Sequence, residues 1–346
     1  MKKMIFCAFG LLLIQPVSAA PPGGFSFDQL LKRHDSNQDG VISSKEFQGP
    51  THLFSRLDRN KDGKLTRIEF SEIQTAFRNK KSPSAHRAPE GVRVVQNLEY
   101  AQIEGQSLKL DLYLPENSKE TDLPLLLWIH GGGWRNGDKA NVNWPILRLS
   151  EAGYAIASIN YRLKDISIHP KNIHDCKGAL RWLRAHAEEY GIDPSRIAAC
   201  GSSAGGHLAL LLGLSSGEDH LEGTVGGNIE YAGPVQAIVD LYGPADLLQM
   251  AEKSPRFNSS HSLTKEQIAN ASPLTYLDDN DPPILILQGD QDKTVPAEQS
   301  HILHKHCQST GVPSELHILQ GAGHGGPEFA DESRYELIKA FLDRHL

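Results

Sequence analysis

Five residues from Gly201 to Gly205 read Gly-Ser-Ser-Ala-Gly and place a serine at the centre of a G-x-S-x-G pattern. They follow the apolar run 197–200 and precede a segment rich in Leu and Ala. A strand, this pattern and a helix in succession form a strained turn that exposes the central hydroxyl as a nucleophile. The pattern alone is weak because Gly and Ser are common, but its placement makes Ser203 a candidate nucleophile.

Residues with acid–base chemistry follow apolar runs later in the chain. Asp290 and Asp292 come just after the run 284–287, and His324 follows the run 316–319. Open α/β sheets place their chemistry at the carboxyl ends of strands, so these positions suit a catalytic site. A serine, a histidine that takes its proton and a carboxylate that orients the histidine form a nucleophilic triad. The pattern leaves both aspartates as candidates for the carboxylate.

A glycine-rich turn, His130-Gly-Gly-Gly-Trp134, follows the apolar run 125–129. Glycines allow backbone N–H groups to approach a developing oxyanion without obstruction by side chains. Alone, the segment is equally an ordinary turn. Its significance comes from standing in one chain with the serine pattern, the aspartates and His324, in the order Ser, Asp, His.

Two twelve-residue loops near the N-terminus carry the oxygen ligands that calcium prefers. Calcium takes roughly six to eight oxygens, supplied by loop positions 1, 3 and 5, a carbonyl at position 7 and a bidentate Glu at position 12. These positions are occupied by Asp35, Asn37, Asp39, Val41 and Glu46 in the first loop, and by Asp58, Asn60, Asp62, Lys64 and Glu69 in the second. Gly40 and Gly63 occupy position 6, where the chain turns sharply.

Residues 25–78 therefore resemble a pair of EF-hands, which implies a small all-α module with two calcium sites. Ile42 and Leu65, at the eighth position of each loop, are expected to pair as a short strand between the loops. Gly49-Pro50 interrupts the connection, so the linking helices must be short. We expect calcium to be structural, with a regulatory role as the alternative.

Beyond the loops the sequence pattern changes twice. Residues 79–90 are polar, contain prolines and lack apolar periodicity, which predicts a linker. Over 91–346, short apolar runs alternate with helix-length segments, among them 173–189 and 204–214. The runs predicted as strands are 125–129, 155–159, 197–200, 237–239 and 284–287. This alternation predicts an α/β domain with a doubly wound, mostly parallel sheet.

Residues 91–346 resemble an α/β-hydrolase of the esterase/lipase type, close to bacterial acetyl-xylan- and feruloyl-esterase-like members. The segments that carry the resemblance are 130–134, 160–163, 175–182, 201–206, 289–292 and 323–325. The resemblance implies that Ser203 is the nucleophile, His324 the general base and Asp292, the second Asp of its pattern, the orienting carboxylate. It also implies that Gly132, Gly133 and Ala204 supply the N–H groups of an oxyanion hole. A triad of this type needs no cofactor, so none is expected for catalysis.

The first nineteen residues have the composition of a signal peptide. Lys2 and Lys3 precede an apolar run from Met4 to Ile14, and Val17-Ser18-Ala19 offers a cleavage site of small residues. The run is shorter than a membrane-spanning helix, and no later stretch is long enough. We expect a mature protein that begins near Ala20 and is exported to the periplasm or the medium.

Net charge and cysteine content limit the classes of partner and of covalent cross-link that we expect. The 346 residues carry a net charge of −7 and no basic stripe, which argues against nucleic acid. Cys176, Cys200 and Cys307 lie in the predicted mature chain, and we expect free thiols, buried in the case of Cys176 and Cys200, because their sequence context is apolar or helical.

The sequence thus predicts an exported serine esterase whose substrate is a small-molecule ester or an ester on a polysaccharide. Two alternatives stay open. One is a serine peptidase-like hydrolase, although related peptidases usually carry a large propeller domain. The other is a calcium-dependent binding protein with an inactive hydrolase domain, although every residue type of the triad is present.

Overall fold

The computed structural model describes residues 27–47, 54, 58, 60–70, 88–116, 122–164, 168–253 and 263–346. The chain divides into two compact units, residues 1–82 and 83–346. The predicted signal peptide and residues 79–87 of the predicted linker lie outside the described residues. Residues 88–90 of that linker belong to the second unit.

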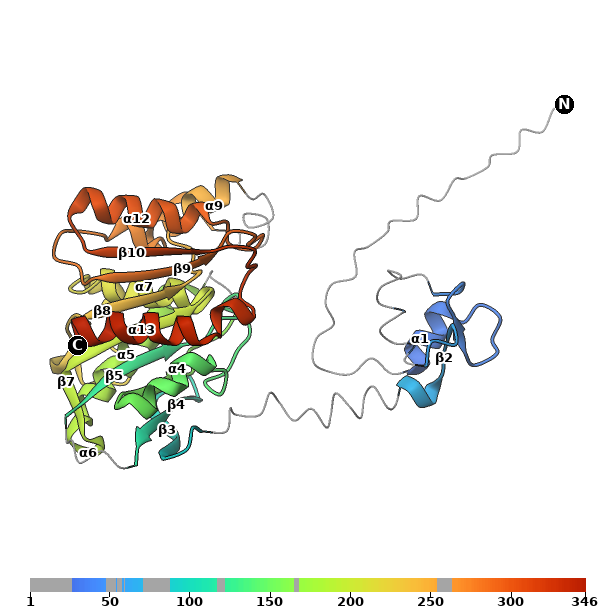
Figure 1. The fold of residues 1–346 in the computed structure, drawn as a ribbon, viewed down its shortest axis with the longest axis horizontal. Coiled ribbons are helices and arrows are strands. Elements are labelled where there is room, and N and C mark those ends of the chain that lie inside the picture. The colour runs from blue at the N-terminus through green and yellow to red at the C-terminus, as the bar shows by residue number, and fades with distance from the viewer. Residues whose placement is uncertain are drawn as a thin grey trace. The chain divides into compact units, whose positions relative to one another are not determined.

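The first unit holds the two acidic loops. Helix α1 (Phe27–His34) leads into the first loop, and the short strands β1 (Ile42–Ser43) and β2 (Lys64–Leu65) pair antiparallel (Figure 1). Ile42 lies opposite Leu65, so the predicted pairing of the two loops is confirmed. Both side chains are fully buried, and with Phe27 and Phe54 they form the apolar core of this unit.

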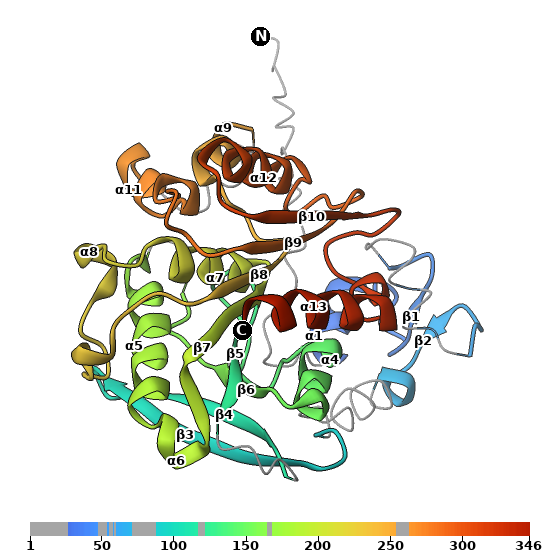
Figure 2. The same ribbon diagram turned by 60° about the vertical axis from the view of Figure 1, so that its left-hand side comes forward.

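The second unit is built on a sheet with the strand order β10-β9-β8-β7-β5-β6-β4-β3 (Figure 2). Its strands are β3 (Val92–Ile103), β4 (Gln106–Pro115), β5 (Leu123–Ile129), β6 (Ala155–Ile159), β7 (Ile192–Ser202), β8 (Ala237–Leu241), β9 (Ile284–Gly289) and β10 (Ser314–Leu319). The six strands from β10 to β6 in this order are parallel to their neighbours. The pairs β6–β4 and β4–β3 are antiparallel.

Buried parallel strands explain why the apolar runs predicted the sheet. Every residue of β6, β8 and β9 is buried, because helices cover both faces of a parallel sheet and leave no solvated side. All five predicted strands are confirmed. The hairpin of β3 and β4 was not predicted, although Leu108, Leu110, Leu112 and Leu114 alternate in β4 with the period of a strand.

Helices cover the sheet on two faces. The helices of the second unit that the structure describes are α4 (Trp144–Arg148), α5 (Lys171–Ala185), α6 (Ala187–Tyr190), α7 (Ala204–Leu214), α8 (Asp219–Glu222), α9 (Leu247–Lys253), α11 (Lys265–Asn270), α12 (Glu298–Thr310) and α13 (Glu332–His345). The predicted helix 173–189 is broken at His186, which leaves helical geometry and stacks its ring on Trp182. The predicted helix 204–214 coincides with α7.

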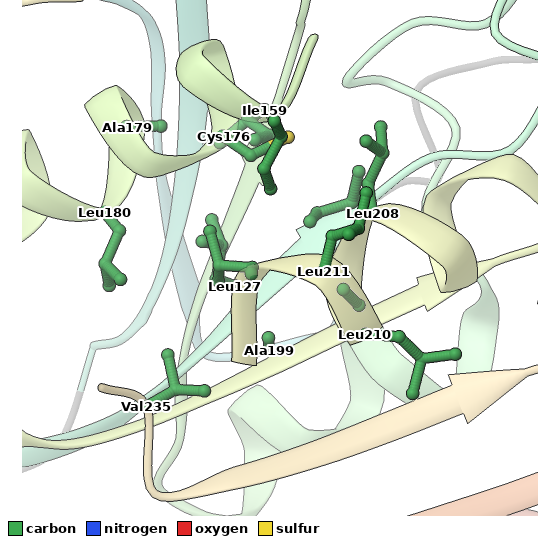
Figure 3. Close-up of a cluster of buried hydrophobic side chains, with 14 of the residues drawn as sticks. Leu127, Ile159, Cys176, Ala179, Leu180, Ala199, Leu208, Leu210, Leu211 and Val235 are labelled. Atoms are coloured by element: carbon green, nitrogen blue, oxygen red, sulfur yellow. The ribbon is translucent and has the colours of Figure 1, made fainter. Parts of the chain in front are cut away.

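Alternate residues of a strand reach different cores. Leu125, Leu127 and Ile129 of β5 belong to the cluster that α5 and α7 cover, while Leu126 and Trp128 belong to the cluster under α4 and α13. Figure 3 shows the first cluster, with Leu127 and Ala199 of the sheet facing Leu208 and Leu211 of α7 and Cys176 of α5. Figure 2 shows α4 and α13 side by side on the other face.

Two further findings concern the cysteines and the search for a membrane-spanning helix. Cys176, Cys200 and Cys307 are buried free thiols, as expected for the first two. Within the described residues, no helix is long and apolar enough to cross a membrane.

Candidate active site

Ser203 lies on a sharp turn between β7 and α7. Its backbone adopts φ 55° and ψ −120°, a strained conformation for a residue with a side chain. The turn requires small neighbours: a Cβ on Gly201 would lie 2.2 Å from the Gly205 carbonyl oxygen, and one on Gly205 would lie 2.0 Å from the Ile129 carbonyl oxygen. The G-x-S-x-G pattern is therefore a steric requirement of this turn, and it raises the hydroxyl above the carboxyl edge of the sheet.

The predicted serine, histidine and aspartate side chains form one hydrogen-bonded chain. The Nε2 atom of His324 lies 2.8 Å from the Ser203 hydroxyl oxygen, and its Nδ1 atom lies 2.6 Å from Asp292 Oδ2. Ser203 follows β7, Asp292 follows β9 and His324 follows β10, so three parallel strands deliver the three groups to the same edge of the sheet.

Asp292 is held by several donors besides His324. Its Oδ1 atom accepts hydrogen bonds from the N–H groups of Thr294 and Val295, and its Oδ2 atom accepts one from Gln288 Nε2. Burial by itself would raise the pKa of Asp292, but the hydrogen bonds from His324 and the two backbone N–H groups lower it below the usual value. The carboxylate is therefore ionised and fixed in orientation at neutral pH.

Asp290, the competing carboxylate, is engaged elsewhere. Its Oδ1 atom accepts a hydrogen bond from the N–H of Gly321 at 2.7 Å, and this contact ties the β9 turn to the turn after β10. The structure thus brings Asp292, and not Asp290, to the histidine.

The glycine-rich turn after β5 has an unusual backbone. Gly132, Gly133 and Trp134 all have positive φ, and a Cβ on Gly132 would lie 2.0 Å from the Asn136 carbonyl oxygen. Among the residues that the structure describes, no hydrogen bond runs from the N–H of Gly132, Gly133 or Ala204 to another protein group. Unengaged N–H groups of this kind are available to an anionic oxygen.

Buried aromatic and imidazole rings hold this turn in place. Tyr161 donates a hydrogen bond to the His130 carbonyl oxygen and stacks on the His130 ring. Trp134 Nε1 donates to Nδ1 of His207, whose Nε2 lies 2.7 Å from the Ala271 carbonyl oxygen. Burial lowers the pKa of His207 to about 3, so the ring stays neutral and Nδ1 remains an acceptor.

Three residues of the site carried no motif. Tyr242 follows β8 and packs edge-on against His324 at 4.9 Å, and the Phe329 ring lies 4.6 Å from it. Gln288 supports Asp292 from within β9. The only sequence signal for Gln288 is a polar residue directly after the apolar run 284–287, and no local signal marks Tyr242.

A pocket of about 220 Å³ lies against Tyr242. Its lining includes Tyr242, Gly326, Phe329, Asn143 and Trp144. The Tyr242 ring thus has the His324 imidazole against its edge and also faces the pocket. The site thus combines a serine hydroxyl in contact with an imidazole, a carboxylate that holds the imidazole, and a turn with positive φ angles beside them.

The two acidic loops of the first unit have matching geometry. In each, the first Asp accepts hydrogen bonds from the N–H groups at positions 5 and 6, as in Asp39 and Gly40 to Asp35. The same pair of bonds runs from Asp62 and Gly63 to Asp58. The Asn at position 3 and the Asp at position 5 are also linked in both loops. The first half of each loop is thus tied together by the same hydrogen bonds.

The glutamates at position 12 differ. Glu46 accepts hydrogen bonds through both carboxylate oxygens, and the bonds from the Ser43 side chain and N–H lower its pKa to about 2. Glu69 is buried; its Oε2 accepts from Thr66, whereas Oε1 has no partner. An unpaired buried carboxylate oxygen is costly, and a cation at the loop centre satisfies it, so the residues present fit calcium.

Across the described ranges, no group of three or more His, Cys, Asp and Glu side chains is gathered to hold a metal by itself. An EF-hand site would add an Asn oxygen and a backbone carbonyl to the three carboxylates of each loop, namely those of Asn37 and Val41 and those of Asn60 and Lys64.

Comparison with known proteins places the chain in a family. The sequence model of the BD-FAE family matches residues 110–307, more than half of the chain. The chain belongs to the BD-FAE family. Separate EF-hand models match residues 27–49 and 52–74, so the N-terminal module of this BD-FAE family member is an EF-hand pair.

Curated relatives of this BD-FAE family member include two mycobacterial proteins. The probable carboxylic ester hydrolase LipM of Mycobacterium tuberculosis is 33% identical over 57% of this chain and 48% of LipM. Esterase LipC of the same organism is 28% identical over 62% of this chain and 56% of LipC. The chain therefore spans about half the length of the curated relatives it matches.

Solved structures share the fold of the second unit. A truncated carbohydrate esterase from gut microbiota superposes with a TM-score of 0.65 at 29% identity, over 74% of this chain and 98% of that chain. The esterase Est2 of Thermogutta terrifontis with propionate bound gives a TM-score of 0.60 at 27% identity, over 74% and 96%. The same esterase phosphorylated by paraoxon gives 0.59 at 26%, over 74% and 94%.

Proposed function

We propose that this protein is a serine hydrolase that cleaves carboxylic esters through Ser203, His324 and Asp292. The observation that carries the proposal is the continuous hydrogen-bonded chain from Asp292 through His324 to a serine on a strained turn. The carboxylic ester hydrolases and esterases among its relatives support the same chemistry.

The first half of the reaction forms an acyl-enzyme. The Ser203 oxygen attacks the ester carbonyl carbon while its proton moves to Nε2 of His324. Asp292 holds the proton on Nδ1, so Nε2 faces the serine as a base, and the carboxylate stabilises the imidazolium that results. The tetrahedral intermediate collapses when the bond to the alcohol oxygen breaks and that oxygen takes the proton from Nε2.

Water completes the cycle. It gives a proton to His324 and attacks the acyl carbon, and the bond to Ser203 breaks as the serine oxygen regains the proton. In both halves the carbonyl oxygen becomes an oxyanion, which the N–H groups of Gly132, Gly133 and Ala204 bind. Each such donor contributes roughly 3–4 kcal/mol of barrier lowering in characterised oxyanion holes. The chemistry uses no metal ligand of the first unit.

We assign the substrate class as esters of short acyl groups on carbohydrate alcohols. The likeness to a carbohydrate esterase supports the alcohol part, and the likeness to an esterase with bound propionate supports the short acyl part.

Calcium binding by the two EF-hand loops is a further part of the proposal. The first loop would hold the ion with Asp35, Asn37, Asp39, the Val41 carbonyl and Glu46; the second with Asp58, Asn60, Asp62, the Lys64 carbonyl and Glu69. Bound calcium supplies positive charge that offsets the repulsion among three carboxylates in each loop. We assign it a structural role.

Export is proposed from the sequence of residues 1–19, and it places the enzyme in the periplasm or the medium, where calcium and polymeric carbohydrate are both accessible. The first residue of protein recovered from those fractions tests it: a start near Ala20 is expected, and an uncut Met1 in the cell interior contradicts it.

An ester panel tests the function. Wild type and Ser203→Ala protein are assayed on p-nitrophenyl esters from acetate to long acyl chains, on acetylated xylan and on a dipeptide anilide. Ser203-dependent hydrolysis of the short esters is expected. Cleavage of the anilide alone identifies a peptidase, and inactivity on every substrate together with calcium-dependent binding identifies the inactive-domain alternative.

A further inference from the structure

His207 lies one helical turn after the nucleophile and joins three segments of the chain. Its backbone N–H donates a hydrogen bond to the Ser203 carbonyl oxygen at the start of α7. Its side chain is fully buried and has a neighbour at each ring nitrogen. Nδ1 lies 3.3 Å from Trp134 Nε1, and Nε2 lies 2.7 Å from the Ala271 carbonyl oxygen. The proposed reaction moves no proton through this imidazole, so its contacts define what it can do.

The two neighbours fix the tautomer of the His207 ring. An indole N–H only donates, so Nδ1 presents its lone pair to Trp134. A carbonyl oxygen only accepts, so the ring proton is on Nε2 and points to Ala271. Burial lowers the pKa of His207 to about 3, and the neutral ring keeps this tautomer at neutral pH. The imidazole is thus a rigid link with an acceptor at one end and a donor at the other.

Trp134 is the residue of the glycine-rich turn that this link holds. It directly follows Gly133 and has φ 58°, in the left-handed region that disfavours residues with a side chain. Its carbonyl oxygen accepts a hydrogen bond from the N–H of Lys164, and its buried ring stands at 87° to the His207 ring. A backbone conformation of this kind persists only where the surroundings determine it. The contact between indole and imidazole therefore helps to fix the backbone of the turn.

Ala271 gives the link a fixed far end. It follows α11 and is fully buried. The hydroxyl of the next residue, Ser272, donates to the Ile268 carbonyl oxygen and accepts from the N–H of Leu247. The position of the His207 ring is thus determined by α7 and by this segment, independently of the turn that the ring contacts.

We propose that His207 is a positioning residue for the oxyanion hole. Through Trp134 it keeps the N–H groups of the glycine-rich turn at a fixed place relative to the Ser203 oxygen. Its backbone belongs to the helix that follows the nucleophile, and its side chain bonds the turn that carries the oxyanion donors, so one residue couples the two. Donors held in place before the reaction stabilise the oxyanion without reorganisation. This inference rests on the proposed ester hydrolysis and names a residue that acts on its transition state.

Trifluoroacetone measures the oxyanion hole directly. The Ser203 oxygen adds to its carbonyl carbon, the hydroxyl proton passes to Nε2 of His324, and the carbonyl oxygen becomes an oxyanion while no group leaves. The inhibition constant Ki of this ketone therefore depends on the same N–H donors as the transition state. Full-length wild type and variants are compared by this Ki, by kcat/KM for p-nitrophenyl acetate and by the pH profile of kcat/KM.

Two substitutions separate the two ends of the His207 side chain. The amide oxygen of Asn lies near the place of Nδ1 and accepts from Trp134, whereas the amide nitrogen of Gln lies near that of Nε2 and donates to Ala271. His207→Gln should lower kcat/KM and raise Ki about tenfold each, a part of the roughly 10²- to 10³-fold effect of removing a whole oxyanion donor. His207→Asn should stay within about threefold of wild type in both, because it keeps the acceptor.

Trp134→Phe breaks the same contact from the other side. It removes the indole N–H and keeps an aromatic ring, so it should reproduce the loss seen in His207→Gln and provides the test if that variant does not fold. The double variant should lose at most about threefold beyond either single variant, since both break one hydrogen bond. The acid limb of the pH profile should not move, because Asp292 and His324 are unchanged. A loss of activity with a shifted limb shows damage to the triad and contradicts the proposed role.

The pair Trp182 and His186 supplies the matched control. Their rings stack with centroids 4.1 Å apart, and His186 Nδ1 lies 2.8 Å from the Trp182 carbonyl oxygen at the end of α5. Neither residue contacts the triad or the glycine-rich turn in any hydrogen bond or ring contact of the described residues. His186→Gln should leave kcat/KM and Ki within about twofold of wild type.

The results that overturn the positioning role differ from those that refute ester hydrolysis. An equal Ki in His207→Gln and wild type, with ester hydrolysis present in both, overturns the positioning role and leaves the proposed function intact. A larger loss in His207→Asn than in His207→Gln does the same, because it assigns the effect to the contact with Ala271. A wild type without Ser203-dependent ester hydrolysis refutes the proposed function and the positioning role with it.

Discussion

Replacing Asp292 by Asn reverses a hydrogen bond at the centre of the site. The carboxylate accepts from Thr294 and Val295 on one oxygen and from His324 on the other. In the variant, the amide oxygen stays with the two backbone N–H groups, so the NH₂ group faces Nδ1 of His324. The imidazole then accepts at Nδ1 and carries its proton on Nε2, where it can no longer take the proton of Ser203.

The loss has an electrostatic part as well. Two unit charges at the 2.6 Å separation of Asp292 Oδ2 and His324 Nδ1 attract by about 6 kcal/mol at an effective dielectric constant of about 20. This attraction develops only when the imidazole becomes charged, so it acts on the barrier. Because His324 is partly exposed, we expect a smaller net loss, about 10³- to 10⁴-fold in kcat.

The assay is initial-rate hydrolysis of p-nitrophenyl acetate at pH 7 by wild type, Asp292→Asn and Asp290→Asn proteins. Asp290 accepts only the Gly321 N–H among the described residues, and an amide oxygen keeps that bond, so Asp290→Asn should retain activity within about threefold. A normal melting temperature confirms that each variant is folded. Full activity in Asp292→Asn together with loss in Asp290→Asn refutes the reasoning.

Three further predictions follow from the site and the loops. Ser203→Ala and His324→Ala should each lower kcat on p-nitrophenyl acetate at least about 10³-fold without altering the thermal melt, since triad members act as a unit; an active Ser203→Ala protein points to another nucleophile. EDTA should lower the melting temperature of the EF-hand pair and leave turnover at 25 °C unchanged, because the metal stabilises only the folded loops; a collapse of activity that calcium restores makes the module regulatory. Burial raises the pKa of Asp240 to about 8 against a hydrogen bond from the Gly243 N–H, so the folded state holds a proton that the unfolded state loses near pH 4. Wild-type stability should therefore fall by about 1.4 kcal/mol per pH unit from about pH 4 to 8 through this group, and Asp240→Asn should remove that slope in urea titrations; parallel pH profiles of the two proteins contradict it.

The parallel core of the second unit could be predicted because burial on both faces produces a local signal. The runs at 155–159 and 284–287 need no alternation to be recognised, and α7 begins where the strained turn at Ser203 ends. The β3–β4 hairpin is different. β3 is largely exposed and mixed in polarity, and only its pairing with β4 stabilises it.

The residues of the candidate site likewise divide into those with a local sequence pattern and those without one. Ser203, Asp292 and His324 stand at positions where the backbone must turn sharply after a strand, and this constraint leaves a glycine-rich pattern in the sequence. Tyr242 and His207 act through contacts with segments distant in the chain, at His324 and Ala271, and such contacts leave no local pattern. The choice between Asp290 and Asp292 likewise depends on where the turn after β10 lies, and a single sequence does not encode that directly.

The central claim is that Ser203 is a nucleophile activated by its neighbours, and covalent trapping tests it most directly. Full-length protein is incubated with one equivalent of paraoxon, the residual p-nitrophenyl acetate hydrolysis is measured, and the modified peptide is sequenced by mass spectrometry. We predict a single diethyl phosphoryl group on Ser203, with activity lost in proportion to labelling, and no labelling in His324→Ala protein over the same time. Full ester hydrolysis in protein labelled completely at Ser203, or inactivation with the label on another residue, would contradict the account.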